Sequence, residues 1–538
     1  MPKFDLISEP WISVVTADGH AGEVGLLEAL TRASQFITIR DPLPTVEFGL
    51  YRLLIALVLD IFQPKNTEAL ADLIETRQFD GAKLEAYFTL WAARFDLFDA
   101  QHPFLQTAGM GDSPAKPLAG LLHPMPSGTN AAHFHHAHEE DFGVSPAAAA
   151  RLLTTIAPFM TAGGAGLSPS INGAPPWYAL VTGQTLFETL CLNLCVLDLP
   201  LTKDQTRPPA WRDDRPMSLD RCQGASLAES LTWRPRRLRL VPGDAGVCSL
   251  TQRRSDIIVR TMQFGPGASC DFLWRDPNVP YKVYDKGPKV MRPQEGKEAW
   301  RETGPLALLR EGEHGREDAK ILFQRPLIVE QFSQMSRVGL LPHVTALNLS
   351  LYGLRTDLKM KIFEWQRETL SVPKPLVLES RFHREADGEM EKAEKIAYAL
   401  RSAIKLTYPR DGAGNKSAFA ALTGSTERGF WQALRPRYEE FLDRLASTVP
   451  TDDTAIQTVR QQWQTRLKDA GQTALDDAIG TLDTDAEALA RWVKATEFYR
   501  FRIRDTFATP EERAARAAAK KNKKAAKDTP KTAQGDPT

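Results

Sequence analysis

The sequence has 538 residues, of which 42% are hydrophobic and 25% are charged, and its 67 basic and 67 acidic residues balance. This length exceeds the roughly 250 to 300 residues at which one core stops growing, and the composition is that of a globular protein, which argues against a disordered or membrane-spanning chain. The apolar stretches at 50–62 and 186–199 are short and interrupted by charges, and the N-terminus has no apolar signal segment. We therefore expect at least two domains, a cytoplasmic location and no membrane partner.

The first two-thirds of the chain mixes strand-like and helical patterns. Residues 4–15 are typical of strands, whereas 46–62 and 83–95 have helical periodicity. Arginines alternate with leucines over 233–241, which predicts a strand with one basic face, and 347–351 alternates in the same way before a hairpin tip at 353–359. These patterns predict a mixed α+β domain over residues 1–372.

A different pattern follows the two-proline segment at 371–375, which we interpret as a linker. Apolar residues recur at helical spacing over 391–407, 430–445, 454–467 and 486–503, which predicts a four-helix bundle over 376–508. The last 26 residues hold eight basic and two acidic residues with few apolar ones, so 509–538 is expected to be a disordered basic tail. The predicted fold class is α+β, with a large mixed domain, a helical bundle and a tail.

Three glycines occur within four residues in the segment AGGAGLSPS at 162–170. Glycine permits backbone angles closed to other residues, and it lets another molecule approach the main chain. A tight turn and a ligand-contacting loop therefore both remain open at this point.

The templates for catalysis are mostly missing. The chain has no GxSxG, no GxxxxGK[ST] and no GxGxxG motif, and its five cysteines form no CxxC pair. Cys191 and Cys195, four residues apart on an apolar stretch, are interpreted as core residues. The histidine-rich segment 133–141 is either a polar loop or a metal site, and a metal-dependent hydrolase is the alternative that rests on it. We expect no catalysis, no metal and no cofactor.

Basic residues gather in two regions. Arg234, Arg236, Arg237 and Arg239 are followed by arginines at 253, 254 and 260, and a second group lies on the last predicted helix. Guanidinium groups on rigid elements suit phosphate contacts, although a solvated charged face is the other interpretation of each group.

Several segments in a fixed order resemble the CasA family, the large subunit of the type I-E CRISPR surveillance complex called Cascade. They are FDLISEPWISV at 4–14, FDAQHPFLQT at 98–107, SGTN at 127–130, the glycine loop, LTWRP at 231–235 and ERGFW at 427–431. The resemblance extends from residue 1 to about 505. Each segment alone is weak, whereas the combination is specific.

The resemblance implies a non-catalytic subunit that recognises the protospacer-adjacent motif in double-stranded DNA, starts strand separation and helps to recruit a helicase-nuclease. Its other partners would be the guide RNA and the remaining Cascade subunits. The minor groove is only about 6 Å wide, which explains why a loop without side chains would enter it. A purely structural scaffold subunit is the alternative within the same complex.

Matching positions imply particular roles in each region of the chain. The motif-binding residues would be Gly163, Gly164, Ala165, Gly166 and Arg260. The strand-separating wedge would be Thr356, Asp357, Leu358 and Lys359, and the contacts to the guide-RNA end and a neighbouring subunit would be Asn130 and Phe134. The contacts to the displaced strand would be Arg491, Lys494, Arg500, Arg502 and Arg504.

The chain departs from the family pattern at three points. No lysine stands at 263–265, where a family lysine aligns, and Arg260 is the nearest basic residue. The wedge offers Asp, Leu and Lys where family members have Asn and Gln. The four cysteines of a zinc site found in some members have no counterparts. The missing lysine and the missing zinc site together predict a different preferred motif, the missing cysteines predict no metal, and the altered tip leaves open which residue acts as the wedge.

Overall fold

The structure of the protein is a computed structural model. It describes residues 2–111, 113–122, 142–163, 166–197, 207–215, 221–271, 274–308, 322–356, 362–408, 416–482 and 485–509, together with 511–512, 514–516 and 518. The contacts divide the chain into two compact units, Met1–Ser380 and Arg381–Thr538.

The boundary lies beyond the expected linker because the two prolines begin a short helix. Helix α10 (Lys374–Leu378) has a proline in its first turn, where the missing amide hydrogen costs nothing. Its Leu376 and Val377 are fully buried, and Arg337 donates a hydrogen bond to the carbonyl of Leu378 at 2.7 Å. These contacts attach α10 to the first unit.

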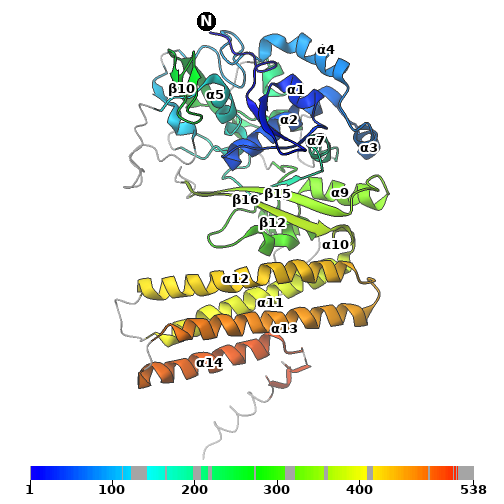
Figure 1. Cartoon of the computed structure of the whole chain (residues 1–538), viewed down its shortest axis with the longest axis vertical. Coiled ribbons are helices and arrows are strands. Elements are labelled where there is room, and N and C mark those ends of the chain that lie inside the picture. Colours follow the sequence, from blue (N-terminus) through cyan, green and yellow to red (C-terminus); the bar gives the residue numbers. More distant parts are fainter. Residues whose placement is uncertain are drawn as a thin grey trace, which may run out of the picture. The chain divides into compact units, whose positions relative to one another are not determined.

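The first unit is built around one buried helix, α2 (Pro44–Phe62), as Figure 1 shows. Fourteen consecutive residues of α2, 45–58, are buried, because it contacts α5, α6, α7, α8 and β15 on its different sides. The other helices of this unit are α1 (Leu26–Thr31), α3 (Thr67–Glu75), α4 (Gly81–Trp91), α5 (Pro146–Leu153), α6 (Ile156–Phe159), α7 (Leu186–Leu192), α8 (Leu227–Leu231) and α9 (Leu327–Arg337). The expected helices at 46–62 and 83–95 are confirmed.

Small sheets surround this helix. Their strands are β1 (Ile12–Thr16), β2 (Ala21–Val24), β3 (Phe36–Ile39), β4 (Ala115–Pro117), β5 (Tyr178–Val181), β6 (Arg221–Cys222), β7 (Arg236–Pro242), β8 (Gly246–Val247), β9 (Arg254–Ser255), β10 (Val259–Pro266), β11 (Ser269–Cys270), β12 (Tyr281–Tyr284), β13 (Gly287–Val290), β14 (Leu322–Gln324), β15 (Ala346–Thr356) and β16 (Ile362–Pro373). The three-stranded sheets have the orders β2-β1-β3, β4-β10-β7, β13-β12-β14 and β16-β15-β5. All of their pairings are antiparallel, and the small β11-β6 pair is parallel.

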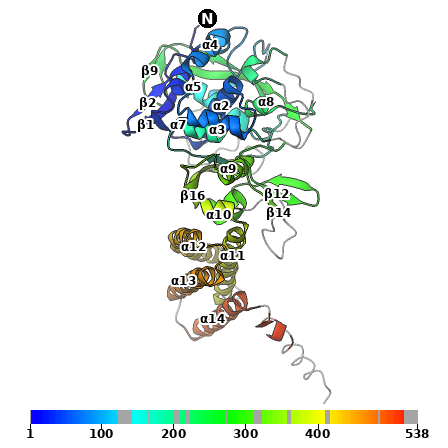
Figure 2. The same cartoon turned by 90° about the vertical axis from the view of Figure 1, so that its right-hand side faces the viewer.

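The second unit is a bundle of long helices that run side by side in Figure 1 and are seen nearly end-on in Figure 2. They are α11 (Ser380–Thr407), α12 (Lys416–Ala446), α13 (Asp453–Gly480) and α14 (Ala486–Thr506). The rings of Tyr438 and Phe441 pack on Trp463 with centroid distances of 5.5 and 5.4 Å, which joins α12 to α13. The mixed α+β class and the C-terminal helices are confirmed.

Two further expectations concern the cysteines of the apolar stretch at 186–199 and membrane-spanning helices. Cys191 and Cys195 are buried, 0% and 6% exposed, as expected for core residues. None of the helices within the described ranges is both long and apolar enough to cross a membrane.

Candidate nucleic-acid interface

The glycine loop closes on itself and has an open side. The amide of Gly163 donates to the carbonyl of Leu167 at 3.0 Å, so the two ends of the tip are held together. Gly166 has φ +79°, which is rarely adopted by residues with a side chain, and no atom lies within 4 Å of the place where its Cβ would stand. Gly164 and Ala165 lie outside the described residues. The described part of the loop therefore presents main chain to open space.

A buried arginine holds both flanks of this loop. The guanidinium of Arg236, 2% exposed, donates through Nη2 to the carbonyl of Thr161 at 2.7 Å and through Nη1 to the carbonyl of Ser168. Burial lowers the pKa of the Arg236 guanidinium to about 10, so it is still charged at neutral pH. Because one planar group binds both flanks, it fixes their separation.

This arrangement confirms the strand with one basic face expected at 233–241, but it removes Arg236 from the arginines expected to suit phosphate contacts. Arg236 alternates with Leu238 and Leu240 and is buried with them. Arg237 and Arg239 occupy the other side of β7 and are half-buried. Arg237 donates to the carbonyl of Pro266 at 2.9 Å and Arg239 to that of Asp99 at 2.7 Å. Arg236 is thus a support of the loop, and it is not available to phosphate.

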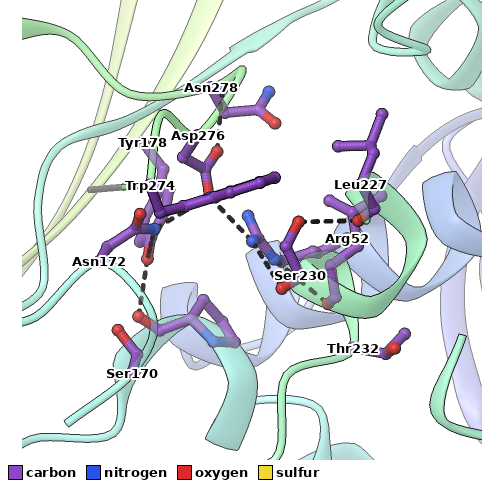
Figure 3. Close-up of polar contacts among 12 residues, drawn as sticks. Arg52, Ser170, Asn172, Tyr178, Leu227, Ser230, Thr232, Trp274, Asp276 and Asn278 are labelled. Carbon is purple, nitrogen blue, oxygen red and sulfur yellow. Dashed lines mark hydrogen bonds and ion pairs between the residues drawn. The ribbon is translucent and has the colours of Figure 1, made fainter. Parts of the chain in front are cut away.

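A buried polar network anchors the segment that follows the loop (Figure 3). The amide of Ser170 donates to the carbonyl of Met160 at 2.8 Å. The Asn172 side chain then donates to Asp276 Oδ2 at 2.9 Å and to the Tyr178 hydroxyl at 3.1 Å. The Tyr178 hydroxyl in turn donates to the carbonyl of Pro158 at 2.7 Å, before the loop.

The same network reaches the central helix. Asp276 and Arg52, which is on α2, form an ion pair at 2.8 Å with 0% and 2% of their side chains exposed. Arg52 also donates to the carbonyls of Ser230 and Leu231, both at 3.2 Å. Removal of either member of a buried ion pair leaves the other charge unpaired, which is strongly destabilising. This pair therefore holds Asp276, the acceptor of the Asn172 hydrogen bond, in place. The loop therefore rests on the central buried helix of the first unit.

Arg260 lies at the wrong end of its strand to join the loop. In the antiparallel pair of β10 and β7, Pro266 is opposite Arg236, whereas Arg260 is six residues away. Six strand residues span about 20 Å. The structure thus does not bring Arg260 to Gly163 and Gly166. Arg237, opposite Gly265, is the basic residue at the loop's end of this pair.

The expected wedge lies at the end of a long hairpin. The pairing of β15 with β16 begins where Ala346 is opposite Pro373 and ends where Thr356 is opposite Ile362, with a bulge beside Thr356. Thr356 is the last described residue of β15, and Asp357, Leu358 and Lys359 lie outside the described residues. Arg355, at the base of the tip, is 3.1 Å from Glu295 and 3.3 Å from Glu364. These two ion pairs therefore hold the end of β15, next to the tip, in place.

The basic residues of α14 fall into two groups. The Arg491 Nε donates to the carbonyl of Thr407 at 3.0 Å, at the end of α11, and the Arg502 guanidinium lies 5.8 Å from the Tyr398 ring centroid. These two are half-buried against α11, whereas Lys494, Arg500 and Arg504 are exposed. Lys494, Arg500 and Arg504 are therefore the solvent-exposed members of the set expected to contact the displaced strand.

Sequence analysis missed Asn172 and Asp276, because their contacts join residues 104 positions apart. The burial of Arg236 did have a signal in the sequence, namely its two-residue spacing from Leu238 and Leu240.

Asn130, Phe134 and the histidine segment 133–141 lie outside the described residues. Across the ranges that the structure describes, no group of three or more His, Cys, Asp or Glu residues is arranged to hold a metal ion.

Comparison with known proteins identifies this architecture. The model of the family CRISPR-associated protein Cse1 matches residues 5–474. The CRISPR-associated protein CasA/Cse1 of Thermus thermophilus is 31% identical over 468 residues, which are 84% of each chain. The crystal structure of Thermus thermophilus CasA aligns over 94% of this chain and all of that chain, with a TM-score of 0.72 and 25% identity.

Another similar structure is a chain of a CRISPR RNA-guided surveillance complex, with a TM-score of 0.72, 19% identity, and 94% and 100% of the two chains covered. The fold and the matched family model define the class, a subunit of a CRISPR RNA-guided complex. The chain belongs to the CasA (Cse1) family, the large subunit of type I-E Cascade.

Proposed function

We propose that this chain recognises a short protospacer-adjacent motif in double-stranded DNA through the loop 163–166 and then starts separation of the two strands. The observation that carries this proposal is a glycine-rich loop whose two flanks are held by polar side chains, Arg236 and Asn172. Minor-groove edges display few distinguishing groups, so a rigid backbone can give the modest discrimination that a short motif needs. Base pairing with a guide would supply the remaining specificity.

The remaining parts of the proposal concern the hairpin tip, the supporting cation and the contacts to other components of the complex. The tip at 356–359 would enter beneath the motif, since an inserted residue can unstack a base step. We assign the supporting cation to Arg237 in preference to Arg260, because Arg237 lies at the loop's end of β7 and β10. Asn130 and Phe134 are proposed to contact the guide-RNA end and a neighbouring Cascade subunit, and the complex would help to recruit a helicase-nuclease.

The experiment measures target-duplex affinity of the guide-loaded complex across a library of motifs, with this chain, without it, and with Gly166→Asn. Asparagine tolerates positive φ, so this variant keeps the turn but adds a side chain to the open side. We expect the parent chain to sharpen binding to a few motifs and Gly166→Asn to lose that preference. An equal rise in affinity for all motifs would make the chain a scaffold, and full preference in the variant would remove the loop from recognition.

A further inference from the structure

Two cysteines lie opposite each other in the small parallel sheet of the first unit. Cys222 is the last residue of β6 and Cys270 the last of β11, and the two are partners in the register of this pair. Neighbouring strands lie about 4.8 Å apart. The Cα atoms of a disulfide are usually about 4.4 to 6.8 Å apart. The backbone therefore holds the two cysteines at a distance that a disulfide can bridge.

The two cysteines share one side of this sheet and are open to small reagents. Both pack against a single apolar cluster, which consists of Ile171, Ala225, Trp233 and Trp274. Cys222 and Cys270 are half-buried, whereas the other three cysteines of the chain are buried. The two cysteines that face each other are thus also the two that solvent reaches.

Cys222 lines an open pocket that is rich in arginine. The pocket has a volume of about 380 Å³, and its arginines are Arg207, Arg215, Arg221 and Arg234. Burial raises the pKa of the Cys222 thiol and Glu229 adds to this rise, while the positive charges of Arg207 and Arg215 oppose it. The thiolate, which is the nucleophile, is therefore a minor species that the adjacent guanidinium groups favour.

Cys270 is linked to the segment that follows the glycine loop. Its thiol donates to the carbonyl of Ile171, with 3.7 Å between sulfur and oxygen. Ile171 lies within the turn 170–173, which is closed by a hydrogen bond from the amide of Gly173 to the carbonyl of Ser170 at 2.9 Å. The next residue, Asn172, binds Asp276. A disulfide has no S–H group, so oxidation of Cys270 removes this donor from the turn.

We propose that Cys222 and Cys270 form a dithiol site that a hydroperoxide oxidises to a disulfide, and that this oxidation loosens the turn 170–173. The Cys222 thiolate attacks one peroxide oxygen, the O–O bond breaks, and the other oxygen leaves with a proton as water or an alcohol. The resulting sulfenic acid reacts with the Cys270 thiol, which forms the S–S bond and releases water. Two thiols thereby lose two electrons, and one peroxide is reduced.

The first measurement treats the reduced full chain with hydrogen peroxide, alkylates the remaining thiols after denaturation and maps the unreduced peptides by mass spectrometry. We expect one cross-linked pair, Cys222 with Cys270, and a number of free thiols that falls by two from five. Dithiothreitol should restore all of them. Cys248→Ser is the matched control, since Cys248 is buried and its loss should leave the cross-link unchanged. Absence of the cross-link, or oxidation of single thiols to sulfinic acid in its place, would overturn the proposal.

Two variants test the order of the steps. Cys270→Ser keeps a hydroxyl donor for the carbonyl of Ile171 but removes the second thiol, so Cys222 should stop at the sulfenic acid and be trapped by dimedone. Arg207→Gln should slow cross-linking about threefold, because a more basic thiol has less thiolate and its greater nucleophilicity offsets only part of that loss. An unchanged rate in Arg207→Gln, or no trapped sulfenic acid in Cys270→Ser, would overturn the assignment of Cys222 as the attacking thiol.

The second measurement compares hydrogen exchange in the oxidised and the reduced chain. The amides of Ser170 and Gly173 donate to the carbonyls of Met160 and Ser170. We expect both amides to exchange faster after oxidation and to recover with dithiothreitol, whereas amides of α13, in the other unit, should not change. Unchanged exchange at Ser170 and Gly173 would overturn the coupling to the turn. Neither measurement uses DNA, so the result is independent of the proposed function.

Discussion

At the scale of single residues, the support of the glycine loop depends on a few buried polar side chains. Arg236 binds two main-chain carbonyls from the loop's flanks, and Asn172 links the following turn to Asp276 and Tyr178. Tyr178 stays a donor over the whole physiological range, since burial raises the pKa of its hydroxyl. Arg236 and Tyr178 are 2% and 0% exposed, so their contribution is to hold the segments on either side of the loop in place.

Arg236→Met tests this support. Methionine fills much of the volume but leaves the carbonyls of Thr161 and Ser168 without their donor, which should lower the free energy of unfolding by about 2 to 4 kcal/mol. Hydrogen exchange of the Gly163 amide should accelerate, because its acceptor at Leu167 would no longer be held. Arg236→Lys should be intermediate, since an ammonium cannot span both carbonyls as the planar fork does. Unchanged exchange in Arg236→Met would show that the loop is rigid without its anchor.

The sequence predicts the location of a strand such as β7 better than it predicts the roles of the side chains on it. The two-residue alternation of β7 predicts Arg237 and Arg239 on one side of the strand, as the structure has them, whereas Arg236 is buried on the side of Leu238 and Leu240 and cannot serve the phosphate contact expected of this group. The partners of Asn172 could not be predicted, because contacts across 104 residues depend on the tertiary fold. The strand before the wedge was predicted, but it is longer than expected: residues 353–356, expected in the hairpin tip, belong to β15 and pair with β16.

At the scale of elements, the helical period located every helix of the bundle, whereas helix lengths were underestimated. The expected segment at 430–445 is the second half of α12, which begins at Lys416. Its first half contains Gly424 and Gly429, and glycine lowers intrinsic helix propensity. Packing in the bundle overrides that cost, as it does at Pro436 within the same helix.

Among the described glycines of the bundle, Gly471 has the closest neighbours, and Gly471→Ala tests its part in helix packing. A Cβ there would stand 2.8 Å from Ile396 Cγ2 on α11, and still closer to the Tyr499 hydroxyl on α14. Tyr499 is 1% exposed and has no room to withdraw. We expect a loss of about 1 to 3 kcal/mol in bundle stability, measured by chemical denaturation. Gly480→Ala is the control, since nothing lies within 4 Å of its Cβ position and the same helix is altered. Equal effects of the two substitutions would mean that close approach of the helices is not the cause.

At the scale of the whole molecule, the chain separates a mixed α+β unit from a helical unit with its own core. The sequence predicted this division from the change of period after residue 372. The fold adds that α10 belongs with the first unit, because Leu376 and Val377 are buried in it. The loop and the hairpin proposed to contact DNA then both lie in the first unit.

This division predicts that residues 381–508 fold alone. Tyr438, Trp463 and Tyr499 are buried among the four helices, so the fragment retains the residues that fill its core. We expect a strongly helical circular dichroism spectrum and one cooperative unfolding transition. The transition should shift when Gly471→Ala is introduced and stay in place with Gly480→Ala.

The same fragment also tests where motif recognition lies. It should show no preference among duplex motifs, because the glycine loop lies in the first unit. A fragment that unfolds without cooperativity would mean that the bundle core is completed by the first unit. A folded fragment with motif preference would move recognition away from the glycine loop, because the fragment lacks the unit that contains this loop.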